Sequence, residues 1–248
     1  MSTLRRMPRR RSYDQYCAAA RALDAVGDRW TLLIVRELLA GPRRYTDLHA
    51  DLPGVSTDVL ASRLKDMERD DLVTRRRLPP PAAASVYELT GRGRDLLPVL
   101  TALAEWGAPE LAERRPTDAV RAHWFAVPLL PVLDELSAGL PGPSVRSGSG
   151  RPERPGLEGV EWSDAATGGG YEGVVEVVLD EGAFHVRLGG GGPVYGEGPV
   201  ERPDARLALD ADTCRALAGG SLSVPDGVRD GLIEVTGEGV LAKLLRGE

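Results

Sequence analysis

The chain of 248 residues is long enough for one large domain or two small ones, and its 42% hydrophobic and 27% charged residues are typical of a globular protein. No apolar run has membrane-spanning length, and no apolar segment follows the basic N-terminus, which excludes a secretory signal. The two cysteines, Cys17 and Cys214, do not make a disulfide framework, so a reducing cytoplasm is the expected compartment.

The charge is divided unevenly along the chain, whose net charge is −6. Residues 1–115 carry 20 Arg/Lys and 16 Asp/Glu, which gives +4, and residues 116–248 carry 11 and 21, which gives −10. An acidic half does not sit on phosphate, so we expect any nucleic-acid surface in the first half.

Residues 1–12 form a basic segment interrupted by proline, with five arginines before position 12. This composition predicts a disordered arm. Its role stays open between an arm without fixed contacts and one that releases counterions from DNA.

Residues 16–26 are rich in alanine and predict a helix that begins near Cys17. A helix N-terminus and Arg21 one turn further on both favour a thiolate, which would make Cys17 a redox sensor. The alternative is a small buried apolar residue, the commoner fate of a free cysteine.

Two further helices are expected before the first glycine-containing turn. Residues 30–39, capped by Asp28, are apolar almost all round and predict the central core helix. Residues 45–51 predict a short third helix, and Pro53-Gly54 a turn. Short helices joined by such a turn are the helix-turn-helix arrangement.

Residues 55–69 follow that turn and predict a helix with Ser56 as its N-cap. Its outer face is small and polar, which suits the major groove, where the first turns of a helix reach the base edges. The alternative is an ordinary amphipathic surface helix. The residues expected on its buried stripe are Leu60, Leu64 and Met67.

Residues 72–78 and 86–89 predict two strands of a hairpin, since the prolines between them cannot pair. A hairpin in this place is a wing. Arg75, Arg76 and Arg77 lie on both faces of its first strand, so at least one points away from the core as a candidate phosphate contact. The alternative is an edge strand guarded by charge.

Residues 91–111 predict one long helix, capped by Thr90 and kinked at Pro98. Its apolar face must be buried, and packing against the N-terminal helix of a second copy is the economical solution. A two-fold dimer would place two recognition helices about one DNA turn apart.

The first half resembles the HxlR-type winged helix-turn-helix regulators over about residues 13–108. The motifs that carry this resemblance include Leu23-Asp24-Ala25-Val26-Gly27-Asp28-Arg29-Trp30, Leu52-Pro53-Gly54-Val55-Ser56 and Tyr87-Glu88-Leu89-Thr90. The resemblance implies a dimeric, MarR-like transcription regulator whose second motif helix enters the major groove. It also matches Cys17 to a cysteine that some members use to sense quinones, aldehydes or oxidants. The wing tip PPPAAAS departs from the family's usual wing.

The second half predicts a helix over 118–140, a flexible loop over 141–156, and a sheet. The expected strands are 173–179, 183–188, 192–197, 206–209 and 232–236, and the expected helices 212–218, 226–231 and 240–245. Cys214 should be core, and His185 packed or exposed rather than a ligand.

We find no catalytic constellation in the sequence, no metal-ligand spacing among the three histidines and no dinucleotide or phosphate-loop motif. We therefore expect no enzyme, no cofactor and no metal.

The order of the second half resembles the sterol-carrier-protein-like domain, on residues such as Pro203-Asp204-Ala205 and Gly231-Leu232-Ile233-Glu234-Val235-Thr236-Gly237. The resemblance implies an apolar tunnel between a sheet and its helices. The alternative is a packed sheet that serves as a dimer or spacer module. The candidate lining residues are Phe184, Val186, Leu188, Leu207, Leu209, Ile233, Leu241 and Leu245.

The expected fold is α+β: a basic arm (1–12), a winged helix-turn-helix domain (13–115) and a sterol-carrier-like α/β domain (116–248). The expected function is a cytoplasmic, dimeric transcription regulator on a pseudo-palindromic operator in double-stranded DNA, gated by a lipid-like molecule and not bound to membrane. The alternatives are thiol sensing through Cys17 and, from another class, a lipid carrier or interaction module. Ser56, Thr57 and Ser62 would approach base edges, and Arg43, Arg63, Lys65, Arg75 and Arg77 would hold phosphates.

Overall fold

The structure is a computed structural model that describes residues 12–81, 84–112, 114–138, 172–189 and 192–248. The chain divides into two compact units, Met1–Leu100 and Thr101–Glu248. This division falls before Arg115-Pro116, where the composition predicts the domain boundary. The arginines of the predicted arm and the predicted loop 141–156 lie outside the described residues.

The first unit begins with four helices, α1 (Ala18–Val26), α2 (Thr31–Leu39), α3 (Tyr45–Ala50) and α4 (Thr57–Arg69). The central place of α2 is confirmed, since Ile34, Val35 and Leu38 are buried. Its predicted cap is wrong: Trp30 occupies the N-cap, and Asp28 instead accepts a hydrogen bond from the Trp30 amide at 3.0 Å. Asp28 therefore closes the turn before the helix.

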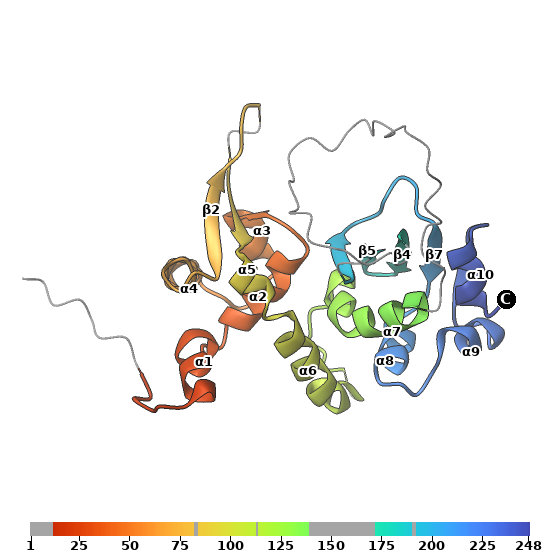
Figure 1. Ribbon diagram of the computed structural model, residues 1–248, viewed down its shortest axis with the longest axis horizontal. Helices are drawn as coiled ribbons and strands as arrows, with labels where there is room; N and C mark the ends of the chain where they lie inside the picture. Colours follow the sequence, from red (N-terminus) through yellow and green to blue (C-terminus); the bar gives the residue numbers. More distant parts are fainter. Residues whose placement is uncertain (1–11, 82–83, 113, 139–171, 190–191) are drawn as a thin grey trace, which may run out of the picture. The chain divides into compact units, whose positions relative to one another are not determined.

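The predicted wing is confirmed as a hairpin of β2 (Val73–Arg77) and β3 (Ser85–Leu89) (Figure 1). A third strand, β1 (Arg43–Arg44), pairs with the other edge of β3, so the sheet order is β1-β3-β2. A two-residue strand has no period, which is why the sequence did not predict β1.

The single helix expected over 91–111 is wrong, because the segment forms two helices, α5 (Gly91–Arg94) and α6 (Leu97–Gly107). Thr90 does cap the first of them, accepting from the Gly93 amide at 3.1 Å. Gly91 and Gly93 make that helix weak, and Pro98 cannot donate the backbone hydrogen bond that a continuous helix needs. The chain therefore breaks before Leu97.

After α6, the second unit continues with the 3-10 helices η1 (Ala108–Ala112) and η2 (Ala122–Phe125), followed by α7 (Ala126–Ala138). The helix predicted over 118–140 is wrong in its first part. The α-helix begins at Ala126, which places Pro128 in the first turn, where proline is well tolerated, and leaves Pro131 inside the helix.

The sheet of the second unit has the order β6-β5-β4-β7-β8, and all its pairs are antiparallel except β4 with β7. The strands are β4 (Gly173–Leu179), β5 (Gly182–Leu188), β6 (Val194–Glu197), β7 (Ala205–Ala208) and β8 (Glu234–Thr236). The five predicted strands are thus confirmed, each within about two residues of its expected ends.

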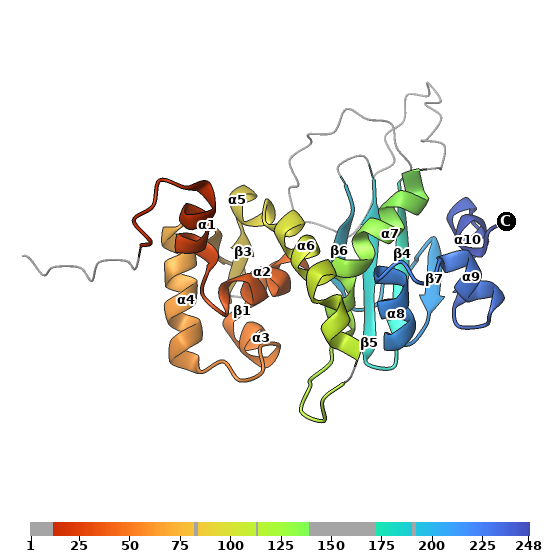
Figure 2. The same ribbon diagram turned by 90° about the horizontal axis from the view of Figure 1, so that it is seen from below.

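Alternation along the strands assigns one face of this sheet to the interior. Val175, Val177, Phe184, Val186 and Leu207 are buried in adjacent register. The helices α7 and α8 (Ala211–Ala218) lie in front of β4 and β5 in Figure 2, and α7 packs on β5. The remaining helices are α9 (Val224–Arg229) and α10 (Val240–Arg246), and α10 contacts β7 and β8.

Among the described residues, no helix has the length and apolar character needed to cross a membrane.

Candidate nucleic-acid interface

The helix α4 is fixed by a local cap and a buried stripe, both as predicted. The Ser56 hydroxyl accepts a hydrogen bond from the Val59 amide at 3.3 Å. Leu60, Leu64 and Met67 are almost completely buried. Thr57, Asp58, Ser62 and Lys65 are therefore left exposed on the outer face.

The start of α4 is held by its neighbours in the helix-turn-helix. The Tyr45 hydroxyl, on α3, donates a hydrogen bond to the Thr57 carbonyl at 2.7 Å. Gly54 has φ +85°, a conformation that favours glycine, and a Cβ there would lie 4.0 Å from the Trp30 ring. These contacts set the angle at which the first turn of α4 faces solvent.

The wing carries exposed cations beside α4. Arg75 and Arg77 are exposed, and the Arg75 guanidinium lies 5.9 Å from the centre of the Tyr87 ring. Arg76 instead faces the Glu88 carboxylate, with its Nε at 3.2 Å. Arg75 and Arg77 are thus the wing arginines available to phosphate.

The Tyr87 ring, which lies beside the Arg75 guanidinium, carries no charge. Burial raises the pKa of Tyr87 above its ordinary value, and Arg75 opposes that rise. The phenol therefore keeps its proton at neutral pH, and the ring offers the guanidinium a π face without a negative charge.

Arg43 is not a phosphate contact, contrary to the prediction. Its side chain is buried, its Nε donates to the Glu37 carbonyl at 2.9 Å, and its Nη1 lies 2.9 Å from Asp51 Oδ2. These contacts connect β1 to the end of α2 and keep the guanidinium away from solvent.

The structure also argues against the predicted phosphate contact of Arg63. It is half-buried, with Nη2 2.7 Å from Asp66 Oδ2 and Nη1 3.6 Å from Asp28 Oδ2. A phosphate contact would have to replace two carboxylates, so this side chain braces α4 against the turn before α2.

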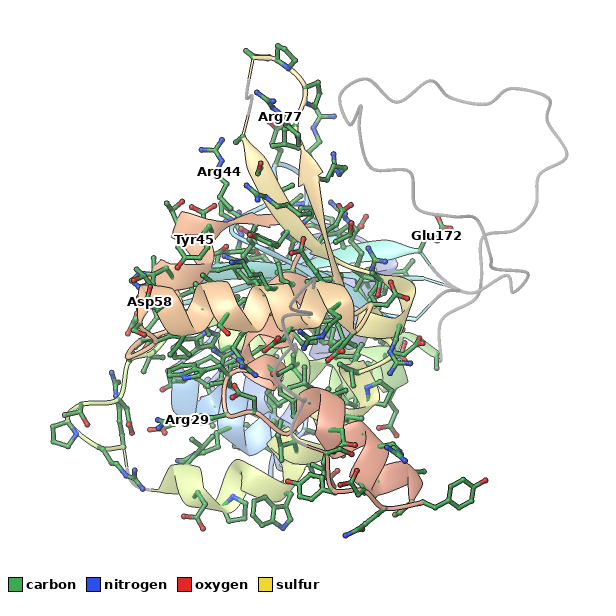
Figure 3. All side chains as sticks on the ribbon, turned by 90° about the vertical axis from the view of Figure 1, so that its left-hand side faces the viewer. Arg29, Arg44, Tyr45, Asp58, Arg77 and Glu172 are labelled. Carbon is green, nitrogen blue, oxygen red and sulfur yellow. The ribbon has the colours of Figure 1, made fainter. Side chains whose placement is uncertain are left out.

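Two exposed arginines that the sequence reasoning missed border the same face. Arg44 follows the buried Arg43 on β1, and Arg29 stacks over Trp30 at 5.3 Å from the ring centre. Figure 3 shows Arg77, Arg44, Tyr45 and Asp58 following one another from the wing to the start of α4, with Arg29 beyond the helix. Alternation from Arg43 would have indicated Arg44 if β1 had been predicted.

The interface is thus a polar helix face bordered by Arg29, Arg44, Lys65, Arg75 and Arg77. Among the residues that the structure describes, none of these five cations has an ion pair with an acid.

Cys17 occupies the N-cap of α1 and is exposed, so the alternative of a buried apolar residue is wrong. Nearby, Arg21 Nη1 lies 3.7 Å from Asp24 Oδ2, so the positive charge of Arg21 is partly neutralised by that carboxylate.

The eight candidate lining residues of the second unit are all buried, each at most 9% exposed. Burial alone does not separate a packed core from a closed tunnel, so the pocket stays a prediction.

The predicted core position of Cys214 is confirmed. Cys214 is fully buried, and its burial, with Asp210 and Glu181 adding, raises its pKa to about 12. His185 is half-buried, its Nδ1 lies 3.1 Å from the Gly198 carbonyl, and its ring occupies the space above Gly196.

The helix-turn-helix, its polar outer helix and the arginine-bearing wing define a winged helix-turn-helix protein. Residues 25–115 match the family described as HxlR-like helix-turn-helix. YvaP from Bacillus subtilis, an uncharacterized HTH-type transcriptional regulator, is 37% identical over 86 residues, which are 35% of this chain and 80% of YvaP. The chain belongs to the HxlR-like helix-turn-helix family and is a transcriptional regulator of that type.

The HTH-type transcriptional regulator YodB from Bacillus subtilis is 34% identical over 85 residues, which are 34% of this chain and 76% of YodB. The solved structure of quinone-bound YodB is 30% identical, with a TM-score of 0.33 and coverage of 37% of this chain and 96% of that one. The regulator names of these relatives give indirect support to the prediction that the chain is not an enzyme. The family match ends at residue 115, so the sterol-carrier-like assignment stays a prediction.

Proposed function

We propose that the chain binds a pseudo-palindromic operator as a dimer, with α4 in the major groove and the wing along the phosphate backbone. The observation that carries this proposal is the exposed face of α4, which is small and polar and is bordered by arginines without acidic partners in the described structure. A major groove admits such a helix, and the cations beside it neutralise phosphates.

Within this arrangement Thr57 and Ser62 approach the base edges, since both are exposed on α4. Ser56 remains at the edge of the contact, because its hydroxyl already accepts the Val59 amide. Lys65, Arg75 and Arg77 hold phosphates, joined by Arg29 and Arg44. Phosphate contacts of this kind position the protein, and base contacts select the sequence.

The dimer proposal is supported by an uncovered apolar stripe on α6. Val99 and Leu103 are each 47% exposed and Trp106 is 81% exposed, at i, i+4 and i+7. Contiguous apolar surface of this kind marks an interface. We expect Trp106→Glu to convert the dimer to a monomer in sedimentation, whereas Glu105→Gln on the same helix leaves it intact. An unchanged oligomeric state in Trp106→Glu would place the dimer contact elsewhere.

The DNA proposal is tested by measuring the affinity of the full chain for its own upstream DNA across a salt series. Binding through several phosphates should weaken steeply and log-linearly with salt. A carrier or interaction module, the function from another class, would show no preference for this DNA over random DNA at any salt.

We further propose that an apolar, lipid-like molecule gates this binding from the second unit. The predicted lining residues are all buried, so such a molecule would have to enter an interior that is closed to solvent. It would then bind one conformation better than the other, which a gating ligand requires. The same salt series is repeated with a lipid extract, and unchanged affinity would contradict the gate.

Thiol sensing is the second candidate because Cys17 is exposed at the N-cap of α1, and because a relative, YodB, has a quinone-bound structure. We expect a quinone to release the wild-type chain from DNA and to leave Cys17→Ser bound. Release of both proteins would exclude Cys17 as the sensor.

A further inference from the structure

The face of α4 that these cations border also carries an exposed acid, and phosphate binding does not explain it. Asp58 lies in the first turn of α4, next to Thr57, and is exposed. In Figure 3 it is found at the start of α4 beside Tyr45, on the side of the unit that also carries Arg44 and Arg77. A carboxylate in this place repels phosphate and weakens non-specific binding.

The polar groups around Asp58 are already committed, whereas its carboxylate is not. The Ser56 hydroxyl accepts the Val59 amide, and the Thr57 carbonyl accepts the Tyr45 hydroxyl. Within the described part of the chain, no side chain donates to Asp58 or pairs with it. A carboxylate only accepts hydrogen bonds, so its partner must be a donor.

We propose that Asp58 selects cytosine at one base pair of each half-site, an inference that rests on the proposed major-groove placement of α4. In that groove cytosine presents the N4 amino donor, which a carboxylate accepts. Guanine presents two acceptors and thymine an acceptor and a methyl group, so both repel or exclude it. Adenine has an amino donor, but its neighbouring N7 acceptor opposes a negative charge.

The proposal makes Asp58 a specificity residue, and its discrimination against the other bases should be on the order of tenfold to hundredfold. A purely structural role, in which the acid stabilises the first turn of α4, would change stability and leave base preference untouched.

The experiment is selection of bound sequences from random double-stranded DNA by the full chain, followed by affinities for the selected site and its single-base variants. Wild type should require cytosine at one position in each half-site. Asp58→Asn should exchange that requirement for adenine, because an amide pairs with adenine N6 and N7. Asp58→Ala should lose the preference there without gaining another.

The matched control is Glu68→Gln, which removes one negative charge from the exposed surface of the same helix further from its start. It should raise affinity for all sequences slightly and leave the selected motif unchanged. Thermal unfolding of each variant checks that the fold is intact.

The experiment distinguishes a failure of the Asp58 proposal from a failure of the DNA-binding proposal. If wild type selects a motif that Asp58→Asn and Asp58→Ala leave unchanged, the proposal for Asp58 is overturned and the DNA-binding function stands. If wild type selects no motif, both are overturned. A change of preference in Glu68→Gln equal to that in Asp58→Asn would also overturn it, since charge alone would then be responsible.

Discussion

Both units contain paired arginines, but in the first unit exposed arginines also lie beside a polar helix. In the second unit Arg206, Arg215 and Arg229 each pair with a carboxylate, at 2.8, 3.0 and 2.7 Å. In the first unit Arg75 and Arg77 stand exposed on the wing, without an acidic partner among the described residues. An arginine neutralised within its own domain contributes little to a phosphate surface, whereas the exposed wing arginines of the first unit lie beside α4 and can meet phosphate.

Apolar residues are buried inside each unit but are exposed on α6. The first unit has a small core around α2 and α4, and α6, which crosses the division between the units, leaves Val99, Leu103 and Trp106 exposed. The second unit buries a continuous sheet face that includes Phe184, Val186 and Leu207. The buried apolar residues stabilise the two folds, whereas the exposed ones on α6 are available to a partner.

The largest effect should come from the interior of the second unit. Phe184→Ala removes a ring that is 0% exposed, and we expect a loss of about 3–5 kcal/mol in unfolding free energy. Chemical denaturation measures it, with Val194→Ala, which changes a side chain that is 40% exposed, as the control within about 0.5 kcal/mol of wild type. A loss below about 1 kcal/mol would show that the ring borders open space, in which case the interior is not closed.

The next effect tests the charges. Arg75→Ala with Arg77→Ala should weaken DNA binding about a hundredfold near 0.1 M salt, because each lost phosphate contact lowers the salt slope by about one. All sequences should weaken alike. The control is the double variant Arg187→Ala and Arg202→Ala, which removes two exposed arginines from the acidic second unit and should not change affinity. If the two double variants lost DNA affinity equally, the proposed difference between the units would be wrong.

A smaller effect separates the two cysteines. Burial raises the pKa of Cys214 from 9.0 to about 12, so above pH 9 the unfolded chain loses a proton that the folded chain keeps. Its contribution to stability is complete below pH 9 and is lost as pH rises towards 12, by about 1.4 kcal/mol per pH unit.

The measurement is urea denaturation between pH 8 and 10, in which Cys214→Ala should lack this part of the slope. Equal slopes in wild type and variant would contradict the buried thiol. A thiol reagent should label the exposed Cys17 in the folded chain, whereas Cys214 should react only on unfolding.

The sequence predicted those elements whose signals are local. The helix α4 has its cap and its apolar stripe within its own residues, and β4 and β5 alternate along their length. Even the break before α6 is visible in Gly91, Gly93 and Pro98, which outweigh an apolar face that favours one helix.

The site was less predictable, because distant partners decide whether a cation is available. Arg43 and Arg44 are neighbours of identical type, yet only Arg43 meets the Glu37 carbonyl and Asp51. Arg63 is occupied partly by Asp28, which lies before another helix. Neither pairing has a spacing that sequence alone reveals, whereas the exposure of Thr57, Ser62 and Lys65 follows directly from the buried stripe of α4.

The smallest effect compares the caps of the two units. Ser56 caps α4 with a neutral hydroxyl, and Asp210 caps α8 by accepting the Thr213 amide at 2.7 Å. The Thr213 amide and hydroxyl hold the pKa of Asp210 below its ordinary value of 3.8. Its charge therefore contributes stability above about pH 4, and this part is lost as pH falls through the lowered pKa.

We expect Ser56→Ala to cost about 1 kcal/mol at every pH where the chain is folded. Asp210→Asn should cost less than that near neutral pH, because asparagine is an equally good N-cap and only the charge is lost, and the difference from wild type should vanish in acid. Thermal unfolding at pH 3, 5 and 7 makes the comparison. A cost of Asp210→Asn that stays constant over this range would mean that packing, and not the carboxylate charge, sets the stability of the cap in the second unit.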